Sequence, residues 1–516
     1  MTRAGVWSTR ELPDVFNAAA YFVDRHVAGG RGAHTAIECG DEQVTYAQVC
    51  ERVNRLGSAL RDCLGVRPEE RVALLLHDGP AFAYSFFGAI KIGAVPVPLN
   101  TLWTPADYEF VLNDARAGVL IVSEALLPQV RAIPPHRLRS LREVVVAADL
   151  LARGSDTLEP EPTSRDAPAF WLYSSGSTGP PKGCVHLQHD MVVCASLYAQ
   201  GILGITPEDR CFSVAKLFFA YGLGNALYFP FAVGATAVLW PGPPTAEHVY
   251  GVIEKHRPTL FFSVPTSYGM LLAHTREGRD VDLSSIRHAV SAGEALPPAL
   301  FERFKERFGI EILDGIGSTE ILHVFISNRP GAIRPGSSGL LVPGYEARIV
   351  DEEGRDAAAG EIGTLLIKGD STCAFYWNRH DTTKDTIDGH WIRTGDKYRQ
   401  DEDGFFWYAG RSDDMLKVGG MWVSPVELEN VLLEHAGVRE CAVVGREDRD
   451  GLIKPAAYVV LRPGAEPSAE RAQELQQFVR SRLADYKRPR WVEFLDELPK
   501  TATGKIQRFK LRQPRA

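Results

Sequence analysis

The first part of the chain alternates between helical and strand-like spacing of apolar residues. Residues 44–61, VTYAQVCERVNRLGSALR, place apolar side chains three and four positions apart, which predicts an amphipathic helix. Residues 71–79, RVALLLHDG, predict a buried strand, and the segments PAFAYSFFGAIKIG and AVPVPLN that follow predict a packed helix and a second strand. Strands that alternate with helices predict a parallel sheet covered by helices.

Further apolar runs predict more strands, and beyond Gly336 the strands become shorter. Further strands are predicted at residues 119–122, 235–240, 260–264 and 288–291. Beyond Gly336 the chain changes to short strands separated by turn residues, as in YEARIVDEEG, GEIGTLLIKGD and DGFFWYAGR. This pattern of short strands and turns predicts a smaller β-rich subdomain.

From Ser424 a compact alternation of helices and strands begins, and about a hundred residues of this kind can form a domain of their own. We therefore expect an α/β protein with an α+β C-terminal domain. Residues 1–412 would form the large N-terminal domain and residues 413–516 the small one, with the joint in GRSDDMLKVGG. Residues 153–166 are polar and contain proline, which predicts a surface connection.

Composition narrows the classes of partner. A chain of 516 residues exceeds what one core usually organises, so two or more domains are expected. The formal charge of −8 and a pI near 6.0 argue against nucleic acid or an anionic membrane as the main partner. Any attraction for phosphate must therefore be local.

Cysteine usage and the N-terminal residues predict a cytoplasmic enzyme. The 8 cysteines include no Cys-x-x-Cys pair, and scattered thiols suit a reducing compartment. The start, MTRAGVWSTRELPDV, has no apolar core of signal-peptide length, and no later segment reaches the ~18 apolar residues of a membrane span.

The stretch SSGSTGPPKG, residues 174–183, follows the apolar run AFWLY and concentrates hydroxyls, glycines and one lysine. A strand that leads into a glycine-rich loop exposes backbone N–H groups, which attract phosphate, and Lys182 adds a positive charge. A Walker A loop requires Ser or Thr directly after its lysine, whereas Lys182 is followed by Gly183. The loop therefore indicates a nucleotide chemistry other than that of P-loop hydrolases.

Further polar stretches complete a possible nucleotide site. DGIGSTE, residues 314–320, ends in a hydroxyl and a carboxylate that could meet an α-phosphate and Mg²⁺. RTGD, residues 393–396, presents a carboxylate suited to ribose hydroxyls, and GRSDD, residues 410–414, offers Arg411. PKTATGKIQR exposes Lys505 on a glycine-bearing loop. Each stretch is a weak signal by itself, and their order and combination carry the argument.

In this combination the sequence resembles the adenylate-forming superfamily of acyl-CoA synthetases, luciferases and peptide-synthetase adenylation domains, from about Val44 to Arg508. FWLYSSGSTGPPKG, KLFFAYGLGN, SAGEALP and DGIGSTEILHVFISN are similar to the corresponding motifs of benzoate-CoA ligases. The resemblance implies a large N-terminal domain, a small mobile C-terminal domain and two half-reactions. A carboxylate first attacks the α-phosphate of ATP to release pyrophosphate, and the CoA thiolate then displaces AMP.

The resemblance also implies roles for individual residues. Lys505 would neutralise charge where the carboxylate meets the α-phosphate, and Glu320 with Thr178 would hold Mg²⁺. Thr319 would contact the α-phosphate, and Asp396 and Arg411 the ribose. The remaining residues implied in nucleotide binding are Ser174, Ser175, Gly176 and Lys182 of the phosphate loop and Ser291, Ala292, Gly293, Asp314 and Gly315 of an adenine slot. Plain turn geometry is an alternative explanation for Gly293 and Gly315.

The segment FFAYGLGN is apolar and carries no charge, whereas a pocket for an α-amino acid would offer a carboxylate to the ammonium group. A flat apolar acid fits better, with space at Ala220 and a ring face at Tyr221. The pocket residues implied by the resemblance are Ala220, Tyr221, Leu223, Gly317, His323 and Val324. Core packing remains an alternative for the segment, and a structural role for His323. Benzoate, hydroxybenzoate and aminobenzoate all remain possible.

For the second half-reaction the resemblance implies rotation of the small domain about Asp413. Rotation would bring Lys417, Gly419 and Gly420 toward the active site, where glycines leave room for a pantetheine arm. Two other functions remain open: an adenylation enzyme that loads a carrier protein in trans, and a non-catalytic binder. We expect ATP, Mg²⁺, CoA and an aromatic acid as ligands, no nucleic acid or membrane partner, and a monomer or homodimer.

Overall fold

The computed structural model describes residues 8–174, 180–274, 281–412, 414–418, 421–449, 452–500 and 506–512. Its largest sheet has nine strands in the order β15-β14-β13-β12-β11-β9-β10-β1-β2. The strands are β1 (Thr35–Cys39), β2 (Glu42–Thr45), β9 (Arg210–Ser213), β10 (Thr236–Leu239), β11 (Leu260–Ser263), β12 (His288–Ser291), β13 (Ile312–Gly317), β14 (Val324–Ser327) and β15 (Leu340–Leu341). The pairs from β13 through β1 are parallel, and the outer pairs are antiparallel.

A second sheet confirms the alternation at the start of the chain. Its four strands are all parallel, in the order β4-β3-β5-β6, with β3 at Arg71–Leu75, β4 at Val95–Pro98, β5 at Val119–Val122 and β6 at Glu143–Val146. A three-stranded sheet, β18-β8-β7, carries the phosphate-loop strands β7 (Pro168–Ser174) and β8 (Lys182–Leu187), with β18 at Phe375–Tyr376.

The predicted amphipathic helix is present as α2 (Tyr46–Ser58), and a π-helical turn continues it from Ala59 to Cys63. Thr45 caps α2 in a capping box with Gln48, which fixes where the helix begins. The packed helix is α3 (Pro80–Lys91), which lies against α2. The other helices around the N-terminal sheets are α1 (Arg25–Ala28), α4 (Pro105–Asp114), α5 (Leu127–Arg131), α6 (Ala147–Arg153), α7 (Asp190–Cys194), α8 (Ala220–Leu223), α9 (Phe229–Val233), α10 (Ala246–His256), α11 (Pro265–Ala273) and α12 (Pro298–Phe308).

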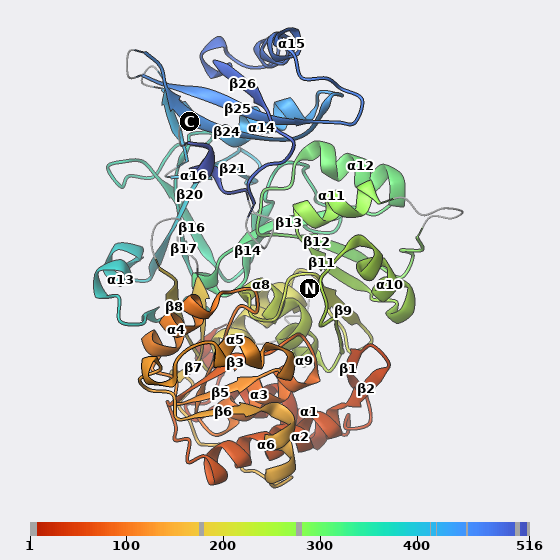
Figure 1. The fold of residues 1–516 in the computed structure, drawn as a ribbon, viewed down its shortest axis with the longest axis vertical. Helices are drawn as coiled ribbons and strands as arrows, with labels where there is room; N and C mark the ends of the chain where they lie inside the picture. The colour runs from red at the N-terminus through yellow and green to blue at the C-terminus, as the bar shows by residue number, and fades with distance from the viewer. Residues whose placement is uncertain are drawn as a thin grey trace.

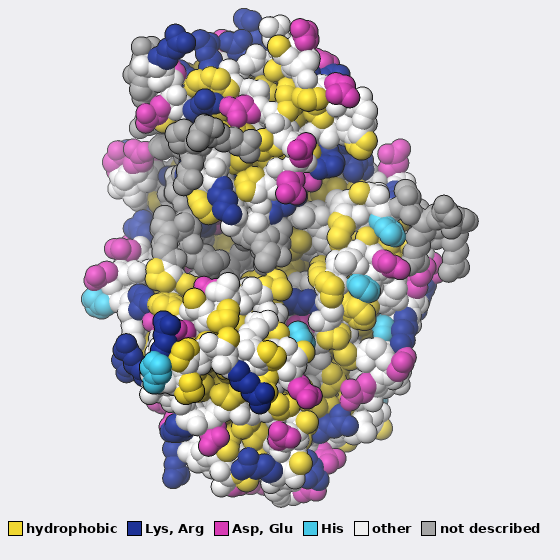
Figure 2. Space-filling model, viewed as in Figure 1, with side chains coloured by type: hydrophobic (Ala, Val, Ile, Leu, Met, Phe, Trp, Pro, Cys, Tyr) yellow, Lys and Arg dark blue, Asp and Glu magenta, His cyan; other side chains and the backbone are white. Residues whose placement is uncertain are grey.

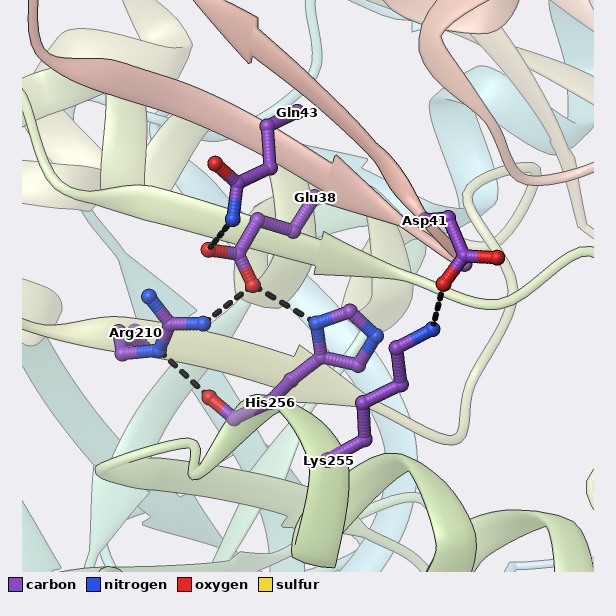
Figure 3. Close-up of a pocket in the computed structure, with 7 residues that line it drawn as sticks. Glu38, Asp41, Gln43, Arg210, Lys255 and His256 are labelled. Atoms are coloured by element: carbon purple, nitrogen blue, oxygen red, sulfur yellow. Dashed lines mark hydrogen bonds and ion pairs between the residues drawn. The ribbon is translucent and has the colours of Figure 1, made fainter.

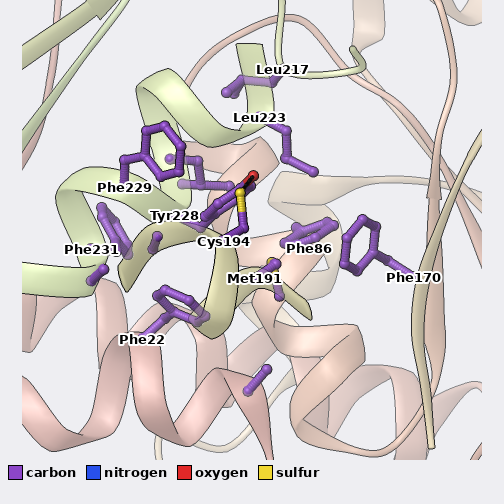
Figure 4. Packing of buried hydrophobic residues seen from close by; sticks show 14 of the residues in the cluster. Phe22, Phe86, Phe170, Met191, Cys194, Leu217, Leu223, Tyr228, Phe229 and Phe231 are labelled. Atoms are coloured by element: carbon purple, nitrogen blue, oxygen red, sulfur yellow. Dashed lines mark hydrogen bonds between the residues drawn. The ribbon is translucent and has the colours of Figure 1, made fainter. Parts of the chain in front are cut away.

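The main core is rich in aromatic side chains (Figure 4). Phe87 joins two parts of it, because its ring lies 5.9 Å from that of Phe22 and 5.7 Å from that of Phe231. Phe86 contacts Phe170 of β7 at 5.5 Å, edge to face. These rings pack the N-terminal helices against the strand that leads into the phosphate loop.

The predicted β-rich subdomain is a five-stranded sheet of β16 (Glu346–Val350), β17 (Gly363–Lys368), β19 (Ile387–Asp388), β20 (Trp391–Gln400) and β21 (Phe406–Arg411), with α13 at His380–Thr386. A separate C-terminal domain, blue in Figure 1, has its own apolar core. It contains β22 (Leu416–Val418), β23 (Met421–Val423), α14 (Pro425–Leu433), β24 (Val438–Glu447), β25 (Ile453–Leu461), α15 (Ala469–Arg480), β26 (Trp491–Phe494) and α16 (Arg508–Leu511). The α/β fold class with an additional α+β domain is therefore confirmed.

Charged side chains of both signs are interspersed over the face drawn in Figure 2. Within the described ranges, no helix has the length and apolar character needed to cross a bilayer.

The predicted surface connection at residues 153–166 has no helix or strand beyond the end of α6 and packs closely on α2. Asn54 donates a hydrogen bond to the carbonyl of Asp156 at 2.8 Å. A Cβ atom on Gly154 would lie 1.7 Å from the carbonyl oxygen of Arg55. The backbone of this segment therefore lies directly against the backbone of α2.

We expect Gly154→Ala to lower the free energy of unfolding by about 1–3 kcal/mol, because the added methyl group displaces backbone at this contact. Gly251→Ala in α10 is the matched control, since nothing lies within 4 Å of its would-be Cβ. That helical position should gain about 0.5–1 kcal/mol. Urea denaturation of both variants checks the contrast, and equal effects would contradict the close packing at Gly154.

Candidate active site

The predicted adenine-slot residues lie together at the carboxyl ends of β12 and β13. Ser291 pairs in register with Asp314, and Ala292 and Gly293 continue the chain beyond β12. Ligands of open parallel sheets bind at this edge. Gly293 has a φ of +90°, a conformation that favours glycine. Burial raises the pKa of Asp314 to about 8.

Packing alone explains glycine at the next two predicted positions. A Cβ on Gly315 would lie 2.7 Å from the carbonyl oxygen of Ile326, and one on Gly317 would lie 2.6 Å from that of His323. Both contacts come from the antiparallel pairing of β13 with β14. The glycines therefore allow the close approach of these strands, which positions the turn that follows.

That turn, the 3₁₀ segment Thr319–Ile321, presents the predicted carboxylate. Oε1 of Glu320 accepts hydrogen bonds from the hydroxyl of Tyr376 at 2.7 Å and from Oγ of Ser174 at 3.4 Å. Nζ of Lys182 lies 4.9 Å from the centroid of the Tyr376 ring. The structure thus brings together the described ends of the phosphate loop and the carboxylate predicted to hold Mg²⁺.

Tyr376 is a residue of this site that sequence reasoning missed. Burial raises the pKa of its hydroxyl, and the charge of Glu320 adds to the effect, so the phenol stays protonated and donates. The sequence around it, AFYWNR, contains a run of three aromatic residues typical of any packed strand. Only the pairing of β18 with β8 brings its hydroxyl to Glu320.

The donor set suits a cation that is shared with substrate phosphates. Among the described residues no three His, Cys, Asp or Glu side chains form a metal cluster. Mg²⁺ usually retains several waters and takes only one or two carboxylates together with phosphate oxygens, so Glu320 fits this kind of site. Thr178, the second predicted ligand, lies outside the described residues.

The predicted acid-pocket segment reaches the same sheet edge. Ala220, Tyr221 and Leu223 lie in α8, and the hydroxyl of Tyr221 donates to the carbonyl of Val290, next to Ser291, at 3.3 Å. The rings of Tyr221 and His323 have centroids 5.3 Å apart. Tyr221 therefore links the segment to the adenine-slot strands.

His323 is buried and neutral. Its Nε2 lies 3.0 Å from Oδ1 of Asn225 and 3.2 Å from the carbonyl oxygen of Tyr221, and burial lowers its pKa to about 3. Leu223 and Val324 are both fully buried, and Leu223 belongs to the main core (Figure 4). None of these side chains carries a charge.

Asp396 and Arg411 lie opposite each other on the paired strands β20 and β21, and Nη1 of Arg411 is 3.1 Å from Oδ1 of Asp396. Burial raises the pKa of Tyr398, and the negative charges of Asp396 and Asp314 contribute to the increase. The two predicted ribose ligands therefore face each other across the paired strands.

Several predicted residues cannot be placed in this site. Ser175, Gly176, Thr178, Asp413, Gly419, Gly420 and Lys505 lie outside the described residues, and Lys417 is described only as a backbone position in β22.

A surface pocket of about 370 Å³ beside α10 contains none of the predicted residues (Figure 3). Its charged groups already pair with one another. Glu38 accepts from Arg210 and from Nδ1 of His256, the latter at 2.7 Å, and Lys255 pairs with Asp41 at 2.5 Å. This network stabilises the fold between β1, β9 and α10.

Comparison with known proteins agrees with the geometry of the site. Residues 24–377 match the AMP-binding enzyme family, and residues 427–505 match the AMP-binding enzyme C-terminal domain. A benzoate–CoA ligase of Thauera aromatica is 49% identical over 511 residues, which cover 97% of each chain.

Two solved structures are similar over nearly the whole chain. An anthranilate CoA ligase in complex with anthranoyl-AMP has a TM-score of 0.93 and 46% identity, covering 97% of this chain and 98% of that one. A benzoate CoA ligase from Burkholderia xenovorans LB400 has a TM-score of 0.89 and 46% identity, covering 97% and 100%. The chain therefore belongs to the AMP-binding enzyme family, within the adenylate-forming superfamily, and is benzoate-CoA ligase-like.

Proposed function

We propose that the protein is an ATP-dependent aryl-CoA ligase that acts on a benzoate-type acid. It converts the acid to an acyl-adenylate with release of pyrophosphate, and then transfers the acyl group to CoA with release of AMP. The observation that carries this conclusion is the 49% identity to a benzoate–CoA ligase over 97% of both chains. The meeting of Ser174, Lys182 and Glu320 beside an uncharged pocket supports it.

In the adenylation step an anionic carboxylate approaches a polyanion, so the protein must supply positive charge and orientation. Lys182 attracts the β- and γ-phosphates, Lys505 neutralises charge at the α-phosphate, and Thr319 contacts that phosphate. Glu320 holds Mg²⁺, which shields the phosphates when bound. Asp396 and Arg411 bind the ribose, while Ser291, Ala292, Gly293, Asp314 and Gly315 surround adenine.

The acid pocket favours an uncharged aromatic ring. Tyr221 and the neutral His323 line it, and Ala220 leaves space for the ring. A charged substituent would be left unpaired there, at a cost of several kcal/mol. Loading of a carrier protein is disfavoured as an alternative, because relatives matched over the full chain are CoA ligases. We place the enzyme in the cytoplasm, where its 8 free thiols remain reduced.

The first test is the product of the reaction. With ATP, Mg²⁺, benzoate and CoA, we expect AMP, pyrophosphate and benzoyl-CoA in equal amounts, with AMP formation dependent on the acid. Chromatography of the nucleotides checks this, with acetate and palmitate as control acids that should react poorly. ADP as the main product would contradict the proposal.

The second prediction concerns Ala220. Ala220→Phe fills space meant for the ring, and overpacking of this kind costs about 1–3 kcal/mol, so the KM for benzoate should rise about 5- to 150-fold. The dissociation constant of ATP should stay within about twofold. Ala220→Gly removes volume in the same place and serves as the control. An equal loss of ATP affinity in the Phe variant would show that the segment acts only in folding.

The third prediction separates the half-reactions. Lys505→Ala should slow adenylation by about 10² or more while sparing CoA attack on supplied benzoyl-adenylate. Asp413→Pro restricts the backbone at the proposed hinge and should leave adenylation but block thioester formation. Lys500→Ala, which removes an ion pair with Glu440, is the control. If both variants fold and each loses the two half-reactions to the same extent, the proposal that the small domain takes a different arrangement for each half-reaction is wrong.

A further inference from the structure

A buried chain of hydrogen bonds connects Asp190 to the backbone of the Thr319–Ile321 turn. Nδ1 of His186 lies 2.7 Å from Oδ2 of Asp190, and Nε2 of His186 lies 2.7 Å from the carbonyl oxygen of Thr319. The side chains of His186 and Asp190 are both 0% exposed. Because water does not reach these side chains, their polar atoms must find hydrogen-bond partners within the protein.

The imidazole of His186 is held in one orientation. Its two partners, a carboxylate and a carbonyl, only accept hydrogen bonds, so each ring nitrogen faces an acceptor. Phe170 stacks on the ring with centroids 5.2 Å apart and planes at 18°. The ring therefore has no room to turn away from Thr319.

Asp190 is fixed in turn. Its Oδ2 accepts from the backbone N–H of Leu187 at 3.1 Å, and its Oδ1 forms an ion pair with Nε2 of His189 at 3.0 Å. Nδ1 of His189 lies 2.9 Å from the carbonyl oxygen of Arg165. Burial alone would raise the pKa of Asp190, yet His186 and His189 hold it below its ordinary value.

The turn that His186 contacts leads directly into a strained residue. Leu322 is buried and has a φ of +73°. Such a conformation in a non-glycine residue costs about 1–3 kcal/mol and persists only where the surrounding structure holds it. The contacts that hold the turn are therefore needed to keep this backbone in place.

Hydrogen bonds to all three carbonyls of the turn supply this support. The backbone N–H of Cys373 donates to the carbonyl of Glu320 at 2.7 Å. Oγ of Ser371 donates to the carbonyl of Ile321 at 3.0 Å. His186 completes the set at the carbonyl of Thr319, so the turn is held from behind along its whole length.

We propose that His186, oriented by Asp190, is a positioning residue that fixes Thr319 and Glu320 for the adenylation half-reaction. The inference rests on the proposed function. His186 acts through the backbone of Thr319, whose side chain and whose neighbour Glu320 face the phosphates in that function. A displacement of about 1 Å at reacting groups can cost about 10² in rate, so loss of this one hydrogen bond is enough to matter.

The test compares two replacements of His186. His186→Leu removes both ring nitrogens, and we expect kcat for adenylation to fall about 10- to 100-fold with the KM for benzoate nearly unchanged. Calorimetry of ATP binding at increasing Mg²⁺ gives a readout that does not depend on turnover, and the Mg²⁺ concentration needed for half-maximal affinity should rise. His186→Gln keeps an amide donor that can reach Thr319 and should recover most of both losses.

A matched control separates positioning from folding. His26 is also buried, with Nε2 2.6 Å from the carbonyl oxygen of Phe231, but it has no contact with the Thr319–Ile321 turn among the described residues. His26→Leu should lower the melting temperature without changing kcat or the Mg²⁺ dependence of ATP binding. Should His186→Leu not fold, His186→Asn takes its place, because its amide is one methylene shorter than that of glutamine.

The outcomes are distinct. The inference would be overturned if folded His186→Leu or His186→Asn kept the wild-type kcat and the wild-type Mg²⁺ dependence of ATP binding. It would also be overturned if His186→Gln recovered neither quantity relative to His186→Leu. A wild-type enzyme that forms no aryl-CoA from any benzoate-type acid would overturn the proposed function itself.

Discussion

The hydrogen bond from Tyr376 to Glu320 is the contact on which the arrangement of this site depends. It connects the three-stranded sheet, which carries both described ends of the phosphate loop, to the end of β13 in the nine-stranded sheet. The phenol is buried and stays protonated, so it can only be satisfied by an acceptor such as this carboxylate. One oxygen of Glu320 is thereby fixed, and the direction in which the carboxylate faces is set by packing.

The surroundings of this contact divide into a polar and an uncharged side. Ser174 donates to Glu320 and Nζ of Lys182 lies over the ring of Tyr376, whereas the predicted pocket residues Tyr221 and His323 carry no charge. In the proposed function, the ring of an aromatic carboxylate would enter the uncharged side while its anionic group faces the cations.

The turn that carries Glu320 is held by hydrogen bonds to its backbone carbonyls. Asp190 and His186 lie in the segment that follows the phosphate loop, and their hydrogen bonds reach across to Thr319. The segment that follows the predicted phosphate loop therefore also supports the Thr319–Ile321 turn. Because His186 lies in β8, the position of this strand affects the position of the Thr319–Ile321 turn.

The sequence by itself determined the fold class, because apolar periodicity and short-range turn signals are local: β3, α3, β4, β5 and β12 all lie where the pattern predicts them. The sequence also identified the family, because each family motif is one continuous stretch of residues. Only the tertiary structure decided which groups meet. Tyr376 reaches Glu320 through strand pairing, His186 reaches Thr319 across 133 positions, and Gly315 and Gly317 are required by the approach of β14. Contacts between distant segments depend on register and packing, which no local pattern encodes.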